Sequence, residues 1–547
     1  MVDIEEEIYE IWKELRPSDA FLEGLNQYAG KLFIFSSENK ERVQKKIQYL
    51  KSKANTQVEK KFLISLEATL KFRDPHHDLS DMTWTLFGHL MKEGVNPLHI
   101  SSLIDCMNQN IDYSINNHNL DALPIELKII LLNYCNALLG MLKSISKDTD
   151  DTALKEKIER GLSKIKEYKD LVPVKGLEKG DFTEVFPILK RDSTGDLGRF
   201  TLYPQLIKEQ YDYYETPDEI EKKGLEWLEK ELPRLMETAK IIADYYEIEC
   251  NIEAVDKQIA QKRNVENTDL VNFIKDFRKK TSAVVEKHLV KINPRYDTRI
   301  IETPKSLLNF IPTAAMTSFD GLTEKPFNVL FVTTDEKHSP PTSPIDIFQL
   351  IVHEEYGHCV NFSNSALGFA IKPNLIEKLD SSLHFPISEA ISFHRELETQ
   401  TLVEELADKK REDLEKEEAE LLDTMASWGD IKEIVLESRF LIYKWRIIRF
   451  LRAIGDVRIN MNKQSVVEFV QWASKKTGFS EKLIYDQIFF FQENPGIAPC
   501  YAIAGMSLKE IQDEAKKKGK DILEFNTIAS SLGFPGRTIF EEKLRNL

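Results

Sequence analysis

Hydrophobic positions recur along most of the chain at intervals of three and four residues, a spacing typical of amphipathic helices. Residues 1–170 consist of successive stretches of this kind with short breaks between them, and one break, Asp148-Thr-Asp-Asp151, resembles a helix start. Thr216-Pro-Asp-Glu219 combines an N-cap Thr, Pro in the first turn and Glu at the third position, so it predicts a long helix running towards Tyr246. A further helix is expected over about 266–289.

The region from Thr303 to Thr334 interrupts the helical pattern with prolines and a glycine. Within it, Phe327–Thr334 is rich in β-branched and aromatic residues and predicts a strand. We expect this strand to offer its edge to an extended peptide. A second short strand is expected at Arg199–Tyr203, and Ile345–Val352 predicts an apolar helix. The fold class that follows is mainly α with a small β element.

Length and composition refine this picture. With 547 residues the chain exceeds a single small core, so we expect two helical lobes around a cleft: 1–295, with a connecting segment near 190–216, and 296–547. The 22 Gly and 21 Pro are too few for the turns of a many-stranded barrel. Lys and Arg number 74 against 90 Asp and Glu, so the net charge of −16 argues against nucleic acid as a partner.

The sequence also bears on the compartment. Five cysteines occur with no Cys-x-x-Cys spacing, which argues against a disulfide framework and a thiolate zinc site. The acidic start, Met1-Val-Asp-Ile-Glu-Glu-Glu7, lacks the basic and apolar regions of a signal peptide. The longest apolar stretch, Ile129–Leu142, is interrupted by polar residues and is too short to span a bilayer. We therefore expect a cytoplasmic protein with no membrane partner, in an oligomeric state that the sequence leaves open.

One stretch, His353-Glu-Glu-Tyr-Gly-His358, requires a chemical explanation. Two imidazoles bracket a carboxylate that directly follows the first of them, as in zinc sites where a Glu acts as general base. The usual motif is H-E-x-x-H, whereas this one is H-E-x-x-x-H. On an ideal α-helix the fifth residue lies ~140° round the axis, which would turn the rings apart. A one-residue π-bulge would restore convergence, and Gly357 is where distortion of the backbone is most easily tolerated.

A third ligand is needed to complete such a site. Glu389, 31 residues after the second His, would make a His2Glu set that leaves the fourth position to water. Glu396 or Glu398 could take its place, and His394 is a competing nitrogen ligand. A di-iron site built on Glu355-x-x-His358 would need a second Glu-x-x-His, which the chain lacks. We therefore expect one Zn²⁺ ion.

The order of these features resembles a large prokaryotic family of zincin-like proteins known as domain of unknown function 885. The resemblance covers about 195–547. Its main segments are His353–His358, Glu389–Ser392 and Pro495–Tyr501, and Thr216–Gly224, Phe327–Thr334 and Phe525–Phe534 also fit. The family has a Pro before the motif glycine that is missing here, which leaves a spacing similar to that of dipeptidyl peptidase III. Cys359 and Asn460 stand where the family has histidines. The resemblance implies a glutamate-zincin metallopeptidase fold, largely helical with a deep cleft.

Roles for the site residues follow. His353, His358 and Glu389 would hold the zinc, and Glu354 would take a proton from the attacking water and pass it to the leaving amine. The oxyanion needs a further donor, and Tyr501 is the candidate that the family-like segment supplies.

A basic stripe of four arginines at helical spacing and a pair of adjacent histidines complete the candidate site residues. Arg452 is favoured to bind a substrate carboxylate because it falls in a family-like segment. The alternative is that the stripe is exposed to solvent and that Glu433 and Glu437 balance its positive charge. His76-His77-Asp78 is interpreted as a capped turn. The stripe consists of Arg446, Arg449, Arg452 and Arg458.

The function that these features predict is that of a hydrolase: a zinc-dependent metallopeptidase acting on short peptides, resembling a carboxypeptidase or a dipeptidase. Two alternatives stay open. One is a catalytically degenerate zincin that serves as a binding or scaffold protein, and the other is a metal hydrolase of non-peptide amides or esters.

Overall fold

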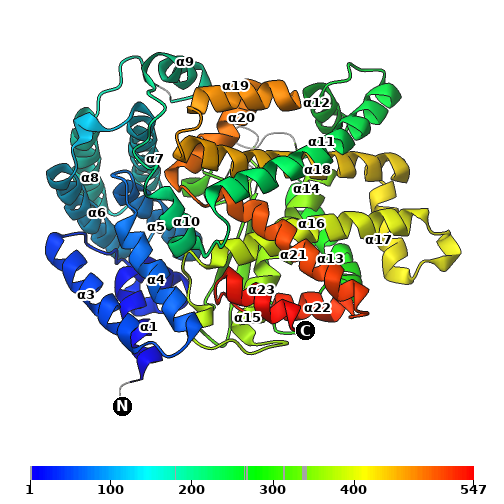
Figure 1. Ribbon diagram of the computed structural model, residues 1–547, viewed down its shortest axis with the longest axis horizontal. Helices are drawn as coiled ribbons and strands as arrows, with labels where there is room; N and C mark the ends of the chain where they lie inside the picture. Colours follow the sequence, from blue (N-terminus) through cyan, green and yellow to red (C-terminus); the bar gives the residue numbers. More distant parts are fainter. Residues whose placement is uncertain are drawn as a thin grey trace.

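The computed structural model describes residues 3–178, 180–263, 265–266, 269–308, 310–311, 314–335 and 342–547. Helices make up most of this chain, which confirms the predicted fold class, and Figure 1 shows α1–α8 gathered on one side and the helices from α11 onward on the other. The helices of the first half are α1 (Ile4–Leu15), α2 (Pro17–Leu22), α3 (Ser37–Lys53), α4 (Gln57–Lys71), α5 (His77–Glu93), α6 (Pro97–Asn117), α7 (Ile125–Asp148), α8 (Thr152–Asp170), α9 (Phe182–Asp192), α10 (Tyr203–Tyr211), α11 (Pro217–Tyr246), α12 (Ile252–Lys262) and α13 (Leu270–His288).

The second half continues with α14, which leads without a break into a π-helix, η5, and then into α15. Two short 3-10 helices, η8 and η9, precede α21. The bounds are α14 (Pro344–Leu350), η5 (Ile351–Cys359), α15 (Val360–Leu367), α16 (His384–Asp408), α17 (Lys416–Ala426), α18 (Ile431–Asn460), α19 (Val466–Thr477), α20 (Glu481–Ile488), η8 (Phe490–Glu493), η9 (Ala498–Tyr501), α21 (Ile503–Lys517), α22 (Ile522–Ala529) and α23 (Arg537–Arg545).

Local sequence signals account for several helix starts. The Oγ1 of Thr216 accepts a hydrogen bond from the Glu219 amide while the Glu219 carboxylate accepts from the Thr216 amide, so α11 begins with the predicted capping box. Asp151 caps α8 through the amide of Leu154. The predicted strand at 199–203 is wrong: residues 200–202 form a turn and Tyr203 begins α10. Arg199 is buried there because its guanidinium donates hydrogen bonds to Asp74 and Asn460, which lie elsewhere in the chain.

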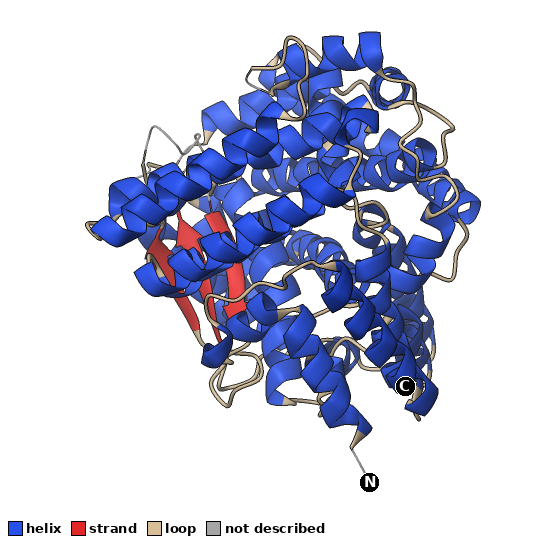
Figure 2. Cartoon of the chain, turned by 90° about the vertical axis from the view of Figure 1, so that its left-hand side faces the viewer, coloured by secondary structure: helices blue, strands red, loops and turns tan. Residues whose placement is uncertain are grey.

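The β element is a three-stranded sheet of β1 (Thr298–Glu302), β2 (Ala314–Phe319) and β3 (Phe327–Val332), covered by helices as Figure 2 shows. Its order is β1-β3-β2, with β3 parallel to β1 and antiparallel to β2. The predicted strand therefore exists but lies in the centre of the sheet. The expectation that it offers a free edge to a peptide is wrong, because both of its edges are paired; β2, which packs against η5, is an edge strand instead.

The largest hydrophobic cluster joins both halves of the chain, from Ala68 in α4 to Met506 in α21. The division into lobes at 295 and 296 stays a prediction. Helix α7 is long and apolar enough to cross a membrane by length and composition alone, and 67% of its most apolar window is buried inside the protein. Core helices of soluble proteins commonly share both properties, so α7 by itself gives weak evidence of a membrane span.

Candidate metal centre

The two motif histidines lie on the π-helix η5, which confirms the predicted change of helical geometry and extends it from one bulge to nine residues. At the end of η5 the amide of Val360 donates to the carbonyl of Glu355, five residues earlier. This hydrogen-bond spacing brings side chains five positions apart to the same side. The rings of His353 and His358 accordingly lie 4.9 Å apart between centroids and nearly perpendicular, at 87°.

Glu389, on α16, meets both histidines. Its Oε2 lies 3.8 Å from Nε2 of His353 and its Oε1 lies 3.6 Å from Nε2 of His358. One ligand atom from each of the three residues falls within 4.8 Å of the others. These separations are close to the ~3.4 Å between ligands of a tetrahedral zinc ion bound at ~2.1 Å. Oε2 of Glu389 is buried and has no hydrogen-bond partner in the part of the chain that the structure describes. The donor set therefore fits a zinc ion.

Glu396 contacts the ring nitrogen of His353 that Glu389 does not face. Nδ1 of His353 donates to Oε1 of Glu396 at 2.8 Å, which leaves Nε2 directed towards Glu389. Arg449 donates to the same carboxylate, with Nη2 2.8 Å from Oε1. Burial alone would raise the pKa of Glu396, but Arg449 and His353 outweigh it and lower the pKa to about 2. Glu396 is thus a permanent anion that fixes the tautomer and the direction of His353.

The other candidate ligands face elsewhere. Glu398 accepts hydrogen bonds from Asn526 at 2.8 Å and from Arg395 at 2.7 Å, on the side of α16 that packs on α21 and α22. His394 lies beside it, with Nε2 3.5 Å from the Glu398 carboxylate. Glu355 is also committed, because Arg278 donates to both of its oxygens. Of the alternatives considered from the sequence, only Glu389 reaches the two histidines.

Gly357 is explained by contact rather than by backbone flexibility. Its φ does not lie in the left-handed region, so another residue could adopt this conformation. A Cβ at this position would lie 2.6 Å from the Cα of Ser392, on the facing surface of α16. Glycine therefore lets η5 approach α16 closely enough for its histidines to meet Glu389.

Gly357→Ala is expected to destabilise the protein by about 1–3 kcal/mol, because backbone atoms of α16 would have to move. It should also weaken zinc binding, since the added methyl group separates the histidines from Glu389. Thermal unfolding and competition with a chelator measure the two effects. Gly140→Ala is the matched control: Gly140 is a helical glycine of α7 with open space at its Cβ, so the substitution should leave zinc binding unchanged. Equal zinc affinity in Gly357→Ala and the wild type would contradict the explanation.

Glu354 directly follows His353 in the sequence. Burial raises the pKa of its carboxyl group, and the charges of His353 and Arg449 act in the opposite direction. A carboxylate with a raised pKa is a stronger base, which suits a group that must accept a proton near neutral pH.

Tyr501 and Arg452 lie next to each other. The Arg452 guanidinium is 5.2 Å from the centroid of the Tyr501 ring and 4.3 Å from that of Phe491. Burial raises the pKa of Tyr501, and the carboxylate of Glu389 adds to the effect, so the phenol stays protonated and can donate. Burial lowers the pKa of Arg452 to about 10. Its hydrogen bond goes to the amide oxygen of Gln487.

Arg446 and Arg449 of the basic stripe are buried, Arg452 and Arg458 are half-buried, and three of the four are paired, so the interpretation of the stripe as a solvated surface is wrong. Arg446 pairs with Glu231, Arg449 with Glu396 and Arg458 with Glu221. Glu433 and Glu437, expected to balance the stripe, instead pair with Arg263 of another segment. Among the described residues, Arg452 alone of the four stripe arginines has no carboxylate within ion-pair distance.

Cys359 and Asn460, which stand where the resembled family has histidines, are also buried. Cys359 is 2% exposed, and the Ser318 hydroxyl of β2 donates to its sulfur at 3.6 Å. Asn460 is fully buried: its Nδ2 donates to Gln492 at 3.0 Å, and its Oδ1 accepts from Arg199 at 3.1 Å. Neither residue lines an exposed surface, so both differences act on packing.

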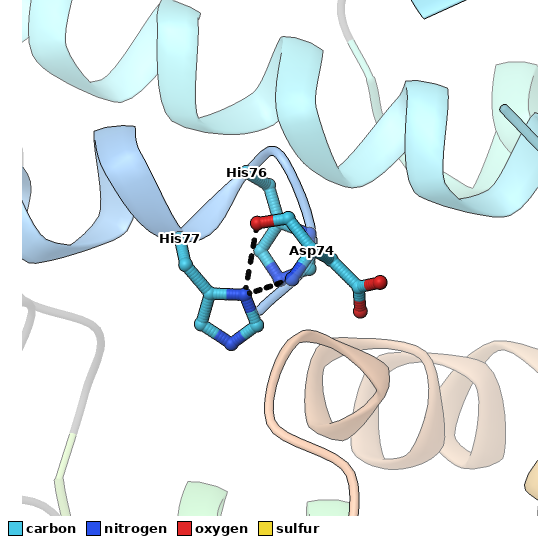
Figure 3. Close-up of side chains that lie close together, drawn as sticks. All are labelled: Asp74, His76 and His77. Atoms are coloured by element: carbon cyan, nitrogen blue, oxygen red, sulfur yellow. Dashed lines mark hydrogen bonds between the residues drawn. The ribbon is translucent and has the colours of Figure 1, made fainter. Parts of the chain in front are cut away.

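A second group of metal-type ligands, Asp74, His76 and His77, lies in the turn before α5 (Figure 3). The two imidazoles stack at 4.3 Å with 26° between their planes, so their in-plane lone pairs run side by side and do not converge. Asp74 is bound by Arg199, with Nε 3.0 Å from Oδ2, and its carboxylate points away from the His77 ring in Figure 3. His77 is bonded to the backbone of Asp74. These contacts hold the turn together, but α5 begins without a side-chain cap and Asp78 pairs with Arg73, so the capping predicted for His76-His77-Asp78 is wrong.

His76 connects this turn to η8. Its Nε2 lies 2.8 Å from the carbonyl oxygen of Glu493, whose carboxyl group accepts a hydrogen bond from the Tyr134 hydroxyl. Burial raises the pKa of Glu493 to about 7.

This raised pKa makes stability depend on pH. Between about pH 4.5 and 7 folded Glu493 holds a proton that the unfolded chain releases, so its contribution to stability is lost as the pH rises through 7. Glu493→Gln should therefore remove about 1 kcal/mol of the change in unfolding free energy between pH 6 and pH 8, measured by urea unfolding. Tyr134 can still donate to the amide oxygen. Identical pH dependence in both proteins would contradict the assignment.

Comparisons with known proteins show the fold only. No protein-family model matches the sequence, and no curated protein matches it. A crystal structure described as that of a "putative lipoprotein" from Colwellia psychrerythraea is similar over 100% of this chain and 99% of its own, with a TM-score of 0.63 and 12% identity. A solved structure of a "putative lipoprotein of unknown function" from Shewanella oneidensis covers 99% of this chain and 98% of its own, with a TM-score of 0.64 and 13% identity.

Proposed function

We propose that this protein is a zinc-dependent peptidase that hydrolyses short peptides. The observation that carries the proposal is the meeting of His353, His358 and Glu389, with a buried Glu389 oxygen that lacks a hydrogen-bond partner among the described residues. An orphaned buried carboxylate oxygen is costly, and a bound cation would remove that cost. Two imidazoles and a carboxylate are the set that catalytic zinc sites use.

The residues around this set divide the reaction between them. His353, His358 and Glu389 would hold a zinc ion, which would act as a Lewis acid and lower the pKa of a water molecule. Glu354 takes the proton of the water as it attacks the peptide carbonyl and delivers it to the leaving amine. The Tyr501 hydroxyl donates to the oxygen that becomes negative. Glu396 keeps the His353 ring in place throughout, because Arg449 holds its carboxylate.

Arg452 supports a preference for peptides with a free carboxyl end. Its guanidinium lies over Tyr501 and Phe491 without an acidic partner among the described residues, so it has charge to offer to a ligand. A planar guanidinium binds a carboxylate through two parallel hydrogen bonds. A carboxypeptidase or dipeptidase mode follows. The β2 strand, at the sheet edge beside η5, could pair with the backbone of the same peptide.

Two measurements on the full chain test this function. Purification with added zinc, followed by elemental analysis, should give one zinc per chain. The zinc-loaded protein should then hydrolyse short peptides with a free carboxyl end and spare the same peptides with that end amidated. Less than one zinc with no hydrolysis would instead support a degenerate zincin that serves as a scaffold. Zinc binding with hydrolysis of non-peptide esters or amides alone would support the other alternative.

We propose the cytoplasm as the compartment, from the cysteine pattern: no Cys-x-x-Cys spacing occurs, and all five cysteines are free. The two structural neighbours are described as putative lipoproteins, which favours a membrane-associated location as the alternative. Cell fractionation separates the two: recovery of the protein in the membrane fraction would overturn the cytoplasmic proposal.

A further inference from the structure

A buried carboxyl group holds the chain segment that leads to Tyr501. Oδ2 of Asp456, on α18, accepts a hydrogen bond from the amide of Gly496 at 2.8 Å and from the Tyr203 hydroxyl at 2.6 Å. Oδ1 accepts from Nδ2 of Asn460 at 3.1 Å. Asp456 is fully buried, so these three donors replace water around its carboxyl group.

Gly496 is confined on its other side by α10. Its φ is +87°, which favours glycine, and a Cβ there would lie 2.7 Å from Leu206 and 3.0 Å from Tyr211. The segment therefore lies between Asp456 on one side and α10 on the other. Helix α10 belongs to the first half of the chain, so residues remote from the motif help to place it.

From Gly496 the chain reaches Tyr501 in little more than one turn. The amide of Cys500 donates to the carbonyl of Ile497 at 2.9 Å, and η9 begins at Ala498. This 3-10 helix packs against α16 and α18, the helices that carry Glu389 and Arg452. A shift at Gly496 would thus be passed directly to the Tyr501 hydroxyl.

We propose that Asp456 is a positioning residue for Tyr501: by holding the amide of Gly496 it fixes where the phenol stands relative to Glu389. The proposal rests on the proposed function, since it gives Asp456 a role through the oxyanion donor of that reaction. Asp456 does not touch the substrate. Its side chain carries no reacting proton and contributes only the position of the segment.

The first test is a double-mutant cycle with the zinc-loaded enzyme. Asp456→Ala removes the acceptor for Gly496 and should lower kcat about 10-fold to 100-fold with little change in KM. Asp456→Asn keeps an oxygen at this position and should restore kcat to within about threefold. In a Tyr501→Phe background, Asp456→Ala should cost less than about threefold, because the group it positions is gone. An equal cost of Asp456→Ala in both backgrounds would overturn the proposal.

The second test needs no activity. Cys500 is fully buried beside Tyr501, so its rate of alkylation, followed by mass spectrometry of its peptide, reports the position of the segment. Asp456→Ala should raise this rate about 10-fold while Asp456→Asn does not. Unchanged protection of Cys500 in Asp456→Ala would refute the placement.

Two further variants keep the tests decisive. If Asp456→Ala fails to fold, Tyr203→Phe removes one donor to the same oxygen and should shift kcat and Cys500 alkylation in the same direction by a smaller factor. Tyr211→Phe is its control: it keeps the ring but removes a hydroxyl of the same helix that accepts a hydrogen bond from Nε2 of Gln210, and it should change neither quantity. If the zinc-loaded wild type hydrolyses no peptide, the proposed function fails, whereas Cys500 alkylation still decides the placement.

Discussion

Glu354→Gln is expected to lower kcat about 10²-fold to 10⁴-fold while the protein keeps one zinc per chain. The amide has nearly the shape of the carboxyl group but cannot accept the proton of the attacking water. The three ligand side chains and the Glu396 bond to His353 do not involve Glu354, so metal binding should be unaffected. Single-turnover kinetics and elemental analysis of the same sample measure both quantities.

The control for this substitution is Glu412→Gln, the same chemical change at an exposed glutamate of the short 3-10 helix Arg411–Asp413 before α17, which should alter neither kcat nor zinc content. Full turnover by Glu354→Gln would refute its role as general base. Loss of zinc with loss of turnover would mean instead that Glu354 supports the ligand set.

His353→Ala is expected to remove both zinc and activity, since two ligands remain and neither is arranged to hold the ion alone. Glu396→Gln provides a graded comparison. It keeps the ligand but weakens the charge that orients it, so zinc affinity should fall about 10-fold to 100-fold while the ion can still be loaded at high concentration. Competition with a chelator gives both affinities.

If His353→Ala retained zinc with the affinity of the wild type, the ion would be bound elsewhere and the centre described above would not be a zinc site. If Glu396→Gln bound zinc as tightly as the wild type, the Nδ1 hydrogen bond would not matter for affinity.

Local signals in the sequence were sufficient for the helical architecture and for the geometry of the motif. The capping box of Thr216 and Glu219 depends on only four consecutive residues, so the start of α11 could be predicted. The spacing of His353 and His358 demanded a π-helical segment because an ordinary helix would separate the rings. Both inferences need only neighbours along the chain.

Partners distant in sequence could not be found in this way. The local sequence predicts a strand at Arg199. Its hydrogen bonds go to Asp74 and Asn460, which are 125 and 261 residues away in the chain. β3 lies in the centre of the sheet because β1 and β2 pair with its two edges. No property of the β3 sequence itself predicts this order. The sequence places Glu396 on the same helix face as Glu389. Whether Glu396 binds a metal or orients His353 depends on its contact with Arg449, which the sequence does not reveal.

The π-helix has a consequence for how the centre forms. A π-helix is rare and less favourable than the α-helix that the same residues could adopt, so an isolated peptide spanning α14 to α15 should relax to α-helix with its two imidazoles on different sides. In the folded protein, the close contact of Gly357 with α16 stabilises the π-helix. Zinc affinity is then a property of the assembled chain, and release of the ion and unfolding of this region should occur together.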